Sequence, residues 1–88
     1  MDGRALVAWN IRKLRVEREL SQEKLAADAG IDRAYLGGME REVENPTVDL
    51  LGRVALALDV PLAALFEAPK RGERKPAPLR AGRKGAAG

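Results

Sequence analysis

Hydrophobic residues along this chain recur every three or four positions in five separate stretches, which is the spacing of an amphipathic helix. No stretch alternates between apolar and polar residues as a β-strand would. The first helix is predicted over residues 3–19, because Val7, Ile11 and Leu14 fall on one of its faces. The pattern therefore predicts an all-α fold.

Residues 21–46 hold the stretch around which the rest of the chain is organised. Ser21 and Asp32 are helix N-cap types, and they precede predicted helices over residues 22–29 and 33–41. Gly30 stands where a helix commonly ends in a left-handed conformation. Two short helices joined by so tight a turn are typical of a helix-turn-helix, whose second helix enters the major groove of DNA.

Two further helices complete the predicted fold of five. The fourth follows Asn-Pro, with Thr47 as its N-cap, and runs to about Leu58. Asp59 ends this helix, and Pro61 takes the first position of the fifth. The positions expected to face the core in the fourth helix are Val48, Leu51, Ala55 and Leu58, and the apolar positions of the fifth are Leu62, Leu65 and Phe66.

The composition changes at residue 69, which divides the chain into a domain over residues 1–68 and a tail over residues 69–88. The domain carries nine Lys and Arg and twelve Asp and Glu, whereas the tail carries seven basic residues and one acidic residue. An acidic body is thus joined to a basic tail of Ala, Gly, Pro, Lys and Arg. Such a tail has too little apolar surface to offset its ordering entropy, so it is predicted to be disordered.

The residue inventory argues against an enzyme. The chain has no Cys and no His, and its single Ser and single Thr, Ser21 and Thr47, are better explained as helix caps than as nucleophiles. No glycine-rich phosphate loop, membrane span or signal peptide is present in the sequence. We therefore expect a cytoplasmic protein with no cofactor, no metal and no membrane. If it binds DNA, we expect it to be nucleoid-associated, and with no second sensing domain we expect no small-molecule ligand.

Six motifs in order and spacing carry a resemblance that spans residues 7–66. They are NIRKLR (residues 10–15), LSQEKLA (20–26), AGI (29–31), ER (40–41), NPT (45–47) and ALDVPLAALF (57–66). With these motifs the chain resembles the phage repressor and Cro-type (XRE-type) helix-turn-helix proteins. The resemblance implies a compact five-helix, repressor-like domain that binds double-stranded DNA.

Candidate residues for contact with the DNA backbone come from the residue chemistry and from the resemblance. The free N–H groups that follow Ser21 favour an anion, and the Gln22 side chain adds a donor. Gln22, Arg41 and Asn45 match backbone-contacting positions of the family, and Tyr35 is expected to bond a phosphate through its hydroxyl. The resemblance also implies an ion pair inside the domain, between Arg15 and Glu40.

The positions that match the groove-facing residues of the family are Arg33, Ala34, Gly37 and Gly38. Arg33 has the guanidinium that reads guanine O6 and N7, although contact with phosphate or solvent alone is the alternative. Ala34 suits a thymine methyl group. Gly37 and Gly38 each cost a helix about 1 kcal/mol relative to Ala, so close approach to the groove, tight helix packing and mere tolerance all stay open.

The sequence departs from the family pattern at Glu42, where a glycine commonly ends the recognition helix. Because a left-handed cap is costly for Glu, the helix is expected to end differently or to run on. Glu42 also makes the loop acidic, together with Glu40, Glu44 and Asp49. A solvated loop is the favoured interpretation of these carboxylates, ahead of a metal site.

The resemblance implies a homodimer on a palindromic operator, acting as a repressor or controller of transcription. The alternative is an antitoxin or protein–protein adaptor module with the same fold. Candidate dimer contacts are the apolar residues expected to be exposed, namely Trp9, Val16, Leu50, Val54 and Leu62. The basic tail either adds salt-dependent affinity for DNA or serves only solubility.

Overall fold

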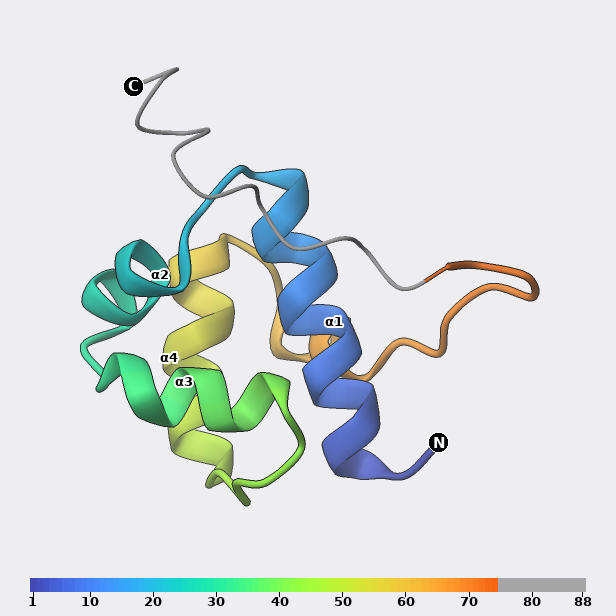
Figure 1. Ribbon diagram of the computed structural model, residues 1–88, viewed down its shortest axis with the longest axis horizontal. Helices are drawn as coiled ribbons and strands as arrows, with labels where there is room; N and C mark the ends of the chain where they lie inside the picture. The colour runs from blue at the N-terminus through green and yellow to red at the C-terminus, as the bar shows by residue number, and fades with distance from the viewer. Residues whose placement is uncertain (75–88) are drawn as a thin grey trace.

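The computed structural model describes residues 1–74, which fold into four α-helices and one short 3₁₀ helix. These are α1 (Gly3–Glu17), α2 (Gln22–Ala29), α3 (Arg33–Glu40), α4 (Val48–Leu58) and η1 (Leu62–Phe66). The described residues include no strand, and the predicted all-α fold is confirmed. In Figure 1, α3 crosses in front of α4, α2 lies beside them, and α1 stands on the other side of the domain.

Each α-helix begins at a short polar side chain that accepts a hydrogen bond from the backbone N–H three residues on. This bond satisfies a backbone donor in the first turn that has no partner within the helix. The capping residues are Asp2, Ser21, Asp32 and Thr47, of which the last three were predicted. The starts of α2, α3 and α4 are therefore determined by local chemistry.

The four α-helices also end alike, each followed by a residue with positive φ. These residues are Glu19, Gly30, Glu42 and Asp59, with φ of 53°, 71°, 66° and 60°. In each case the next N–H bonds the carbonyl oxygen five residues back, as Val43 N does to Gly38 O at 2.9 Å. This left-handed ending corrects the expectation for Glu42, whose conformational cost is offset by the cap hydrogen bonds it makes possible.

Three predicted boundaries need small corrections. Helix α1 ends at Glu17 and not at residue 19, because Glu19 turns left-handed. Helix α3 ends at Glu40, with Arg41 as its C-cap. The fifth helix is a single 3₁₀ stretch, and Pro61 precedes it as the cap residue and does not take its first position.

The core lies between the helices and is formed by apolar side chains from every one of them. Leu51, Ala55 and Leu58 face this core as predicted, but Val48 is 66% exposed. Val54, expected at the surface, is fully buried. The inward face of α4 is thus rotated from the predicted one, because α2 packs on one side of α4 and η1 on the other.

The other candidates for a dimer contact are also partly covered. Leu50 and Leu62 pack against the core. Trp9 and Val16 are half-buried on α1. The indole nitrogen of Trp9 is buried and has no hydrogen-bond partner among residues 1–74.

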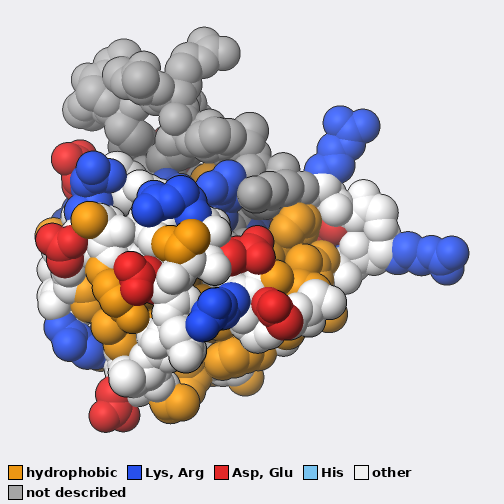
Figure 2. All heavy atoms as spheres, turned by 60° about the horizontal axis from the view of Figure 1, so that its bottom comes forward, with side chains coloured by type: hydrophobic (Ala, Val, Ile, Leu, Met, Phe, Trp, Pro, Cys, Tyr) orange, Lys and Arg blue, Asp and Glu red, His pale blue; other side chains and the backbone are white. Residues whose placement is uncertain are grey.

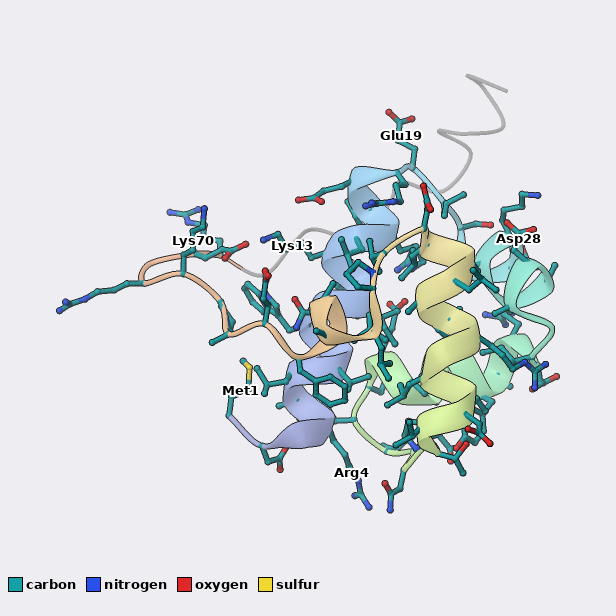
Figure 3. The ribbon with its side chains drawn as sticks, turned by 180° about the vertical axis from the view of Figure 1, so that it is seen from behind. Met1, Arg4, Lys13, Glu19, Asp28 and Lys70 are labelled. Atoms are coloured by element: carbon teal, nitrogen blue, oxygen red, sulfur yellow. The ribbon has the colours of Figure 1, made fainter. Side chains whose placement is uncertain are left out.

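The segment after η1 returns to α1. The buried side-chain amide of Asn10 donates to the carbonyl oxygens of Leu65 and Glu67 at 3.0 and 2.9 Å. Further on, Lys13 pairs with Glu73 at 2.8 Å, and Figure 3 shows Lys13 on the side of α1 from which this segment extends. The predicted tail of residues 69–88 thus begins with residues in contact with α1, and the rest of that prediction falls outside the described residues.

Candidate nucleic-acid interface

The start of α2 presents backbone N–H groups at the surface. The Ser21 hydroxyl accepts from Lys24 N at 3.0 Å, which uses one of the donors in the first turn. Ser21 and Gln22 are both partly exposed, so the remaining first-turn donors lie near solvent. The positive end of the helix dipole adds to the attraction of this position for an anion.

The turn between α2 and α3 is closed by Arg53, a residue of α4 that the sequence analysis did not single out. Its guanidinium donates to Ala29 O at 3.1 Å and also to Gly30 O. These two carbonyls lie at the C-terminal end of α2, where a cation is favoured. Arg53 therefore holds the turn that sets the angle between the two helices.

The first turn of α3 exposes the residues that the sequence analysis placed in the groove. Arg33 and Ala34 are exposed, and Tyr35 is half-buried against the core. Asp32 caps the helix through Tyr35 N at 3.3 Å. The described geometry leaves the Arg33 and Ala34 side chains free to meet a ligand from outside.

Gln22 links the starts of the two helices. Its amide oxygen accepts from Arg33 at 3.4 Å, and its amide nitrogen donates to Glu40 at 3.2 Å. Because Glu40 is only 3% exposed, this pair of bonds runs from the interior of the domain to its surface. The buried Glu40 thus orients the Gln22 side chain, and Gln22 in turn orients Arg33.

Glu40 lies at the inner end of this chain and is surrounded by cations. Arg15 donates to both carboxylate oxygens, at 2.7 and 2.8 Å, so the pair implied by the resemblance is present. A second arginine, Arg12, has its Nε 3.6 Å from the same carboxylate, too far for a hydrogen bond. The carboxylate at the end of α3 is therefore tied to α1 by charge as well as by hydrogen bonds.

The two glycines of α3 are buried beneath side chains of the same helix end and loop. A methyl group added at Gly37 would lie 3.2 Å from an Arg41 guanidinium nitrogen and 3.7 Å from the Gln22 amide oxygen. One added at Gly38 would lie 2.6 Å from Glu44 Cγ. In the free domain, tight packing accounts for Gly38, and groove contact at either glycine requires Arg41 or Glu44 to move aside.

Gln22, Arg33 and Arg41 thus gather beside Gly37, and together they place two guanidinium groups and one amide on a single face. Asn45 is not part of this group, because it lines a pocket on the far side of the α3–α4 loop. On the face of the domain that Figure 2 shows, acidic and basic side chains are mixed, with apolar side chains exposed between them. No three metal-ligating residues within residues 1–74 are placed to hold an ion.

Comparison with known proteins agrees with this geometry. Residues 11–65 match the family model described as helix-turn-helix. The chain belongs to the helix-turn-helix family of repressor (XRE) type. No helix in the described part of this helix-turn-helix protein is long and apolar enough to cross a membrane.

Among the relatives, an uncharacterised HTH-type transcriptional regulator, y4dJ of Sinorhizobium fredii, is 45% identical over 60 residues, which are 68% of this chain and 78% of that protein. The crystal structure of a hypothetical transcription factor from Neisseria is 37% identical, covers 80% of each chain and has a TM-score of 0.76. The controller protein C.Esp1396I, solved as a tetramer with its natural 35 base-pair operator, is 32% identical over 75% of this chain and 87% of that one, with a TM-score of 0.69.

Proposed function

We propose that this protein is a homodimeric transcriptional regulator, a repressor or controller, that inserts α3 into the major groove of a palindromic operator. The observation that carries the proposal is the cluster of Gln22, Arg33 and Arg41 on the exposed face of the helix-turn-helix. The cluster is held from inside by Glu40, so its position is set by the folded core. The operator complex of C.Esp1396I supports this role for a protein of the same fold.

Within this proposal, α3 reads the bases. Arg33 donates two hydrogen bonds to a guanine, and Ala34 packs on a thymine methyl group. Gly37 and Gly38 allow the middle of the helix to approach the groove once the side chains above them move. Tyr35 bonds a phosphate beside the groove.

The remaining contacts position the domain on the phosphate backbone. Ser21 and Gln22 present the start of α2 to one phosphate. Arg41 follows α3 and reaches the backbone on the other side of the groove, and the exposed Asn45 reaches the backbone separately, from the α3–α4 loop. Since residues 1–68 carry a net negative charge, the attraction for DNA has to come from such local groups, from the basic tail, or from both.

A dimer doubles these contacts and reads two related half-sites about 34 Å apart, one turn of DNA. An operator-binding protein works in the cytoplasm, associated with the nucleoid. Control by protein concentration, self-assembly or a separate partner fits a chain with no second sensing domain among its described residues. The proposal involves no cofactor and no catalytic step.

The test is selection of genomic DNA fragments by the full-length protein at roughly physiological salt, where non-specific binding is weak. We expect a palindrome with a guanine at the same place in each half. Arg33→Ala should then lose about 1–3 kcal/mol of discrimination at that base and little elsewhere. Arg18→Ala removes an exposed arginine at the far end of α1 and is the matched control.

If the selection recovers no preferred sequence, the regulator proposal is wrong. The antitoxin or adaptor interpretation would then explain the same fold without base readout. A preferred sequence that does not depend on Arg33 would keep the function and reject the assignment of the reading residue. The two results are distinct, so the experiment tests function and site separately.

The basic residues beyond the domain are proposed to add affinity that is independent of sequence. Deleting residues 75–88 removes four Lys and Arg and should flatten the dependence of affinity on salt, because fewer counterions are released on binding. The preferred operator should stay the same. Equal salt slopes for the two proteins would show that the tail serves another purpose, such as solubility.

A further inference from the structure

Of the five large apolar side chains that are exposed among the described residues, three belong to α4 and η1, two elements that pack together. Leu56 is 80% exposed, Val48 66% and Phe66 43%. Val48 and Leu56 stand four residues to either side of Gly52, so residues 48, 52 and 56 follow one another along one face of α4. Single exposed apolar residues are common, but a grouped set indicates a contact surface.

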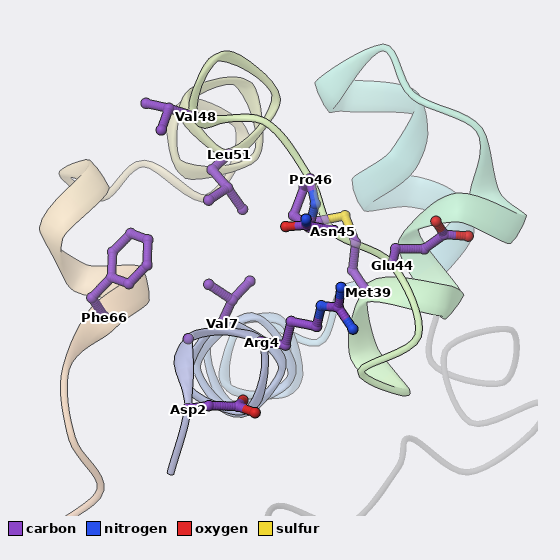
Figure 4. Close-up of a pocket in the computed structure, with 11 residues that line it drawn as sticks. Asp2, Arg4, Val7, Met39, Glu44, Asn45, Pro46, Val48, Leu51 and Phe66 are labelled. Carbon is purple, nitrogen blue, oxygen red and sulfur yellow. The ribbon is translucent and has the colours of Figure 1, made fainter.

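Val48 and Phe66 also flank a pocket of about 490 Å³. Figure 4 shows the side chains of Val7, Leu51 and Phe66 turned toward this hollow, with Val48 at its edge. Arg4 and Asn45 lie on the opposite side of the opening with acidic Glu44 beyond them, and acidic Asp2 lies at another edge, below Val7 in this view. An apolar interior with charges of both signs at its rim suits an inserted apolar side chain better than a small ion of either charge.

Gly52 lies between the exposed Leu56 and the pocket. A methyl group built at Gly52 meets no atom within 4 Å, so this part of the α4 surface is flat and open. A flat centre with a projecting side chain four residues to one side and a hollow four residues to the other is self-complementary under two-fold symmetry. When two antiparallel copies of α4 cross at Gly52, a helix residue n positions after Gly52 in one copy meets the residue n positions before Gly52 in the other.

Charge follows the same symmetry. Asp59 follows the last residue of α4 and Asn45 lies in the loop before its start, so a two-fold axis at Gly52 would bring the end of α4 that carries Asp59 toward the end near Asn45 in the other copy. Arg4 lies beside Asn45 on the pocket rim. Arg4 and Asp59 are exposed and have no ion pair within residues 1–74. The two-fold axis would therefore bring Arg4 of each copy near Asp59 of the other, which makes two equivalent contacts.

We propose that Leu56 of a second copy of this chain fills the pocket between Val48 and Phe66, with Gly52 on the two-fold axis and Asp59 beside the Arg4 of the second copy. The inference rests on the homodimer of the proposed function and identifies the surface through which it forms. It replaces the apolar residues that the sequence analysis had considered for this contact. Trp9, Val16, Leu50, Val54 and Leu62 are all partly or fully covered in the folded domain.

The first test measures the mass of the full-length protein in solution across a concentration series. Leu56→Lys should raise the dissociation constant of the dimer at least tenfold, because it places a charge in the pocket of the other copy. Ala27→Lys puts the same charge on exposed α2 and should leave the dimer unchanged. Since Leu56 contributes little to the core, its replacement should not change the unfolding curve recorded by the fluorescence of the single Trp9 at concentrations where both proteins are monomers. A Leu56→Lys protein that dimerises like the unmodified chain overturns the proposal.

The second test places charges on the axis. Gly52→Glu and Gly52→Lys should each dimerise at least tenfold more weakly, because a residue on the axis meets its own copy. An equimolar mixture should recover a mixed dimer. Gly52→Gln separates the effect of side-chain bulk from that of charge. If the Gly52→Gln protein dimerises normally while the mixture of the Glu and Lys variants forms no mixed dimer, Gly52 is not on the axis and the proposal is wrong. If Gly52→Gln also fails to dimerise, close approach at Gly52 is supported.

DNA binding distinguishes this surface from the function itself. A monomeric Leu56→Lys protein should still prefer its half-site but lose at least tenfold in affinity for the full palindrome. If the unmodified protein dimerises through this surface and selects no sequence, the surface stands and the regulator function fails. If it selects a palindrome and the Leu56 variant still dimerises, the function stands and the surface fails.

Discussion

Arg15 and Glu40, twenty-five residues apart in the chain, form a buried pair in which the guanidinium donates to both carboxylate oxygens at 2.7 and 2.8 Å. Arg15 is on α1 and Glu40 is the last residue of α3. The same carboxylate accepts from Gln22 at the start of α2. The Glu40 carboxylate therefore joins α3 to α1 through Arg15 and to α2 through Gln22.

Glu40→Gln should lower the free energy of unfolding by about 3 kcal/mol or more, because a neutral amide leaves the Arg15 charge buried without its partner. Urea unfolding followed by the fluorescence of Trp9 measures the change. Asp28→Asn makes the same chemical change in the exposed pair of Lys24 and Asp28, which are 3.1 Å apart. That control should cost less than about 0.5 kcal/mol. Equal losses in the two variants would mean that burial does not set the importance of the pair.

The structure shows why the helix starts were predictable and several contacts were not. A cap such as Ser21 acts on an N–H three residues away, so its signal is contained in adjacent sequence. Asn10 and Arg53 bond carbonyls that the fold brings to them from other elements. Nothing in the sequence near either residue indicates those partners. Asn10 and Arg53 were therefore missed as structural residues.

Side-chain exposure on α4 shows a second limit. Periodicity identifies an apolar face of a helix but not its centre when apolar residues cover more than half of its circumference. For this reason Val48 was expected to be buried but is exposed, and Val54 was expected to be exposed but is buried. At Glu42 the conformational cost of a left-handed glutamate suggested a different helix end, but the left-handed turn typical of the family is present without the glycine.

The two glycines of α3 should respond differently to Ala. At Gly37 the new methyl group meets the end of the flexible Arg41 side chain, which is able to shift, so stability should rise by about 1 kcal/mol from helix propensity. At Gly38 it meets Glu44 Cγ at 2.6 Å, and stability should fall by about 1–3 kcal/mol. Thermal unfolding of both variants measures the difference.

The control for this pair is the double change Gly38→Ala with Glu44→Ala. It removes the Cγ atom in question and should restore most of the lost stability. A Gly38→Ala protein more stable than the unmodified chain would show that the loop relaxes freely. The packing explanation for Gly38 would then be rejected, leaving tolerance or approach to the groove.

Glu42→Gly should raise the free energy of unfolding by about 1 kcal/mol, because Glu42 has a φ of 66° and only glycine adopts that region without steric cost. The cap hydrogen bond from Val43 N to Gly38 O remains possible in the variant. Ala27→Gly, at an exposed position inside α2, is the opposite control and should lose about 1 kcal/mol. If both variants lost stability, the cost assigned to the left-handed Glu42 would be incorrect.

The pairing of Lys13 with Glu73 should depend on pH. The hydrogen bond from the Lys13 ammonium, aided by the Lys70 backbone N–H, lowers the pKa of Glu73 below its ordinary value of 4.5. The hydrogen bond to Glu73 likewise raises the pKa of Lys13 above 10.5. A lowered carboxyl pKa stabilises the folded contact above about pH 4.5, and this contribution is lost as the pH falls through the lowered value. For Lys13 the contribution is full below pH 10.5 and is lost as the pH rises through the raised value.

Titration of the Glu73 carboxyl carbon by NMR should therefore give a midpoint below 4.5 in the unmodified protein. Lys13→Met removes the largest cause of the shift, so the pKa of Glu73 should return toward 4.5, short of it by the effect of the Lys70 N–H. Amide hydrogen exchange of residues 70–74 should quicken in the variant at neutral pH, because the segment loses its tie to α1. Identical Glu73 midpoints in the two proteins would mean that this segment does not rest on α1 in solution.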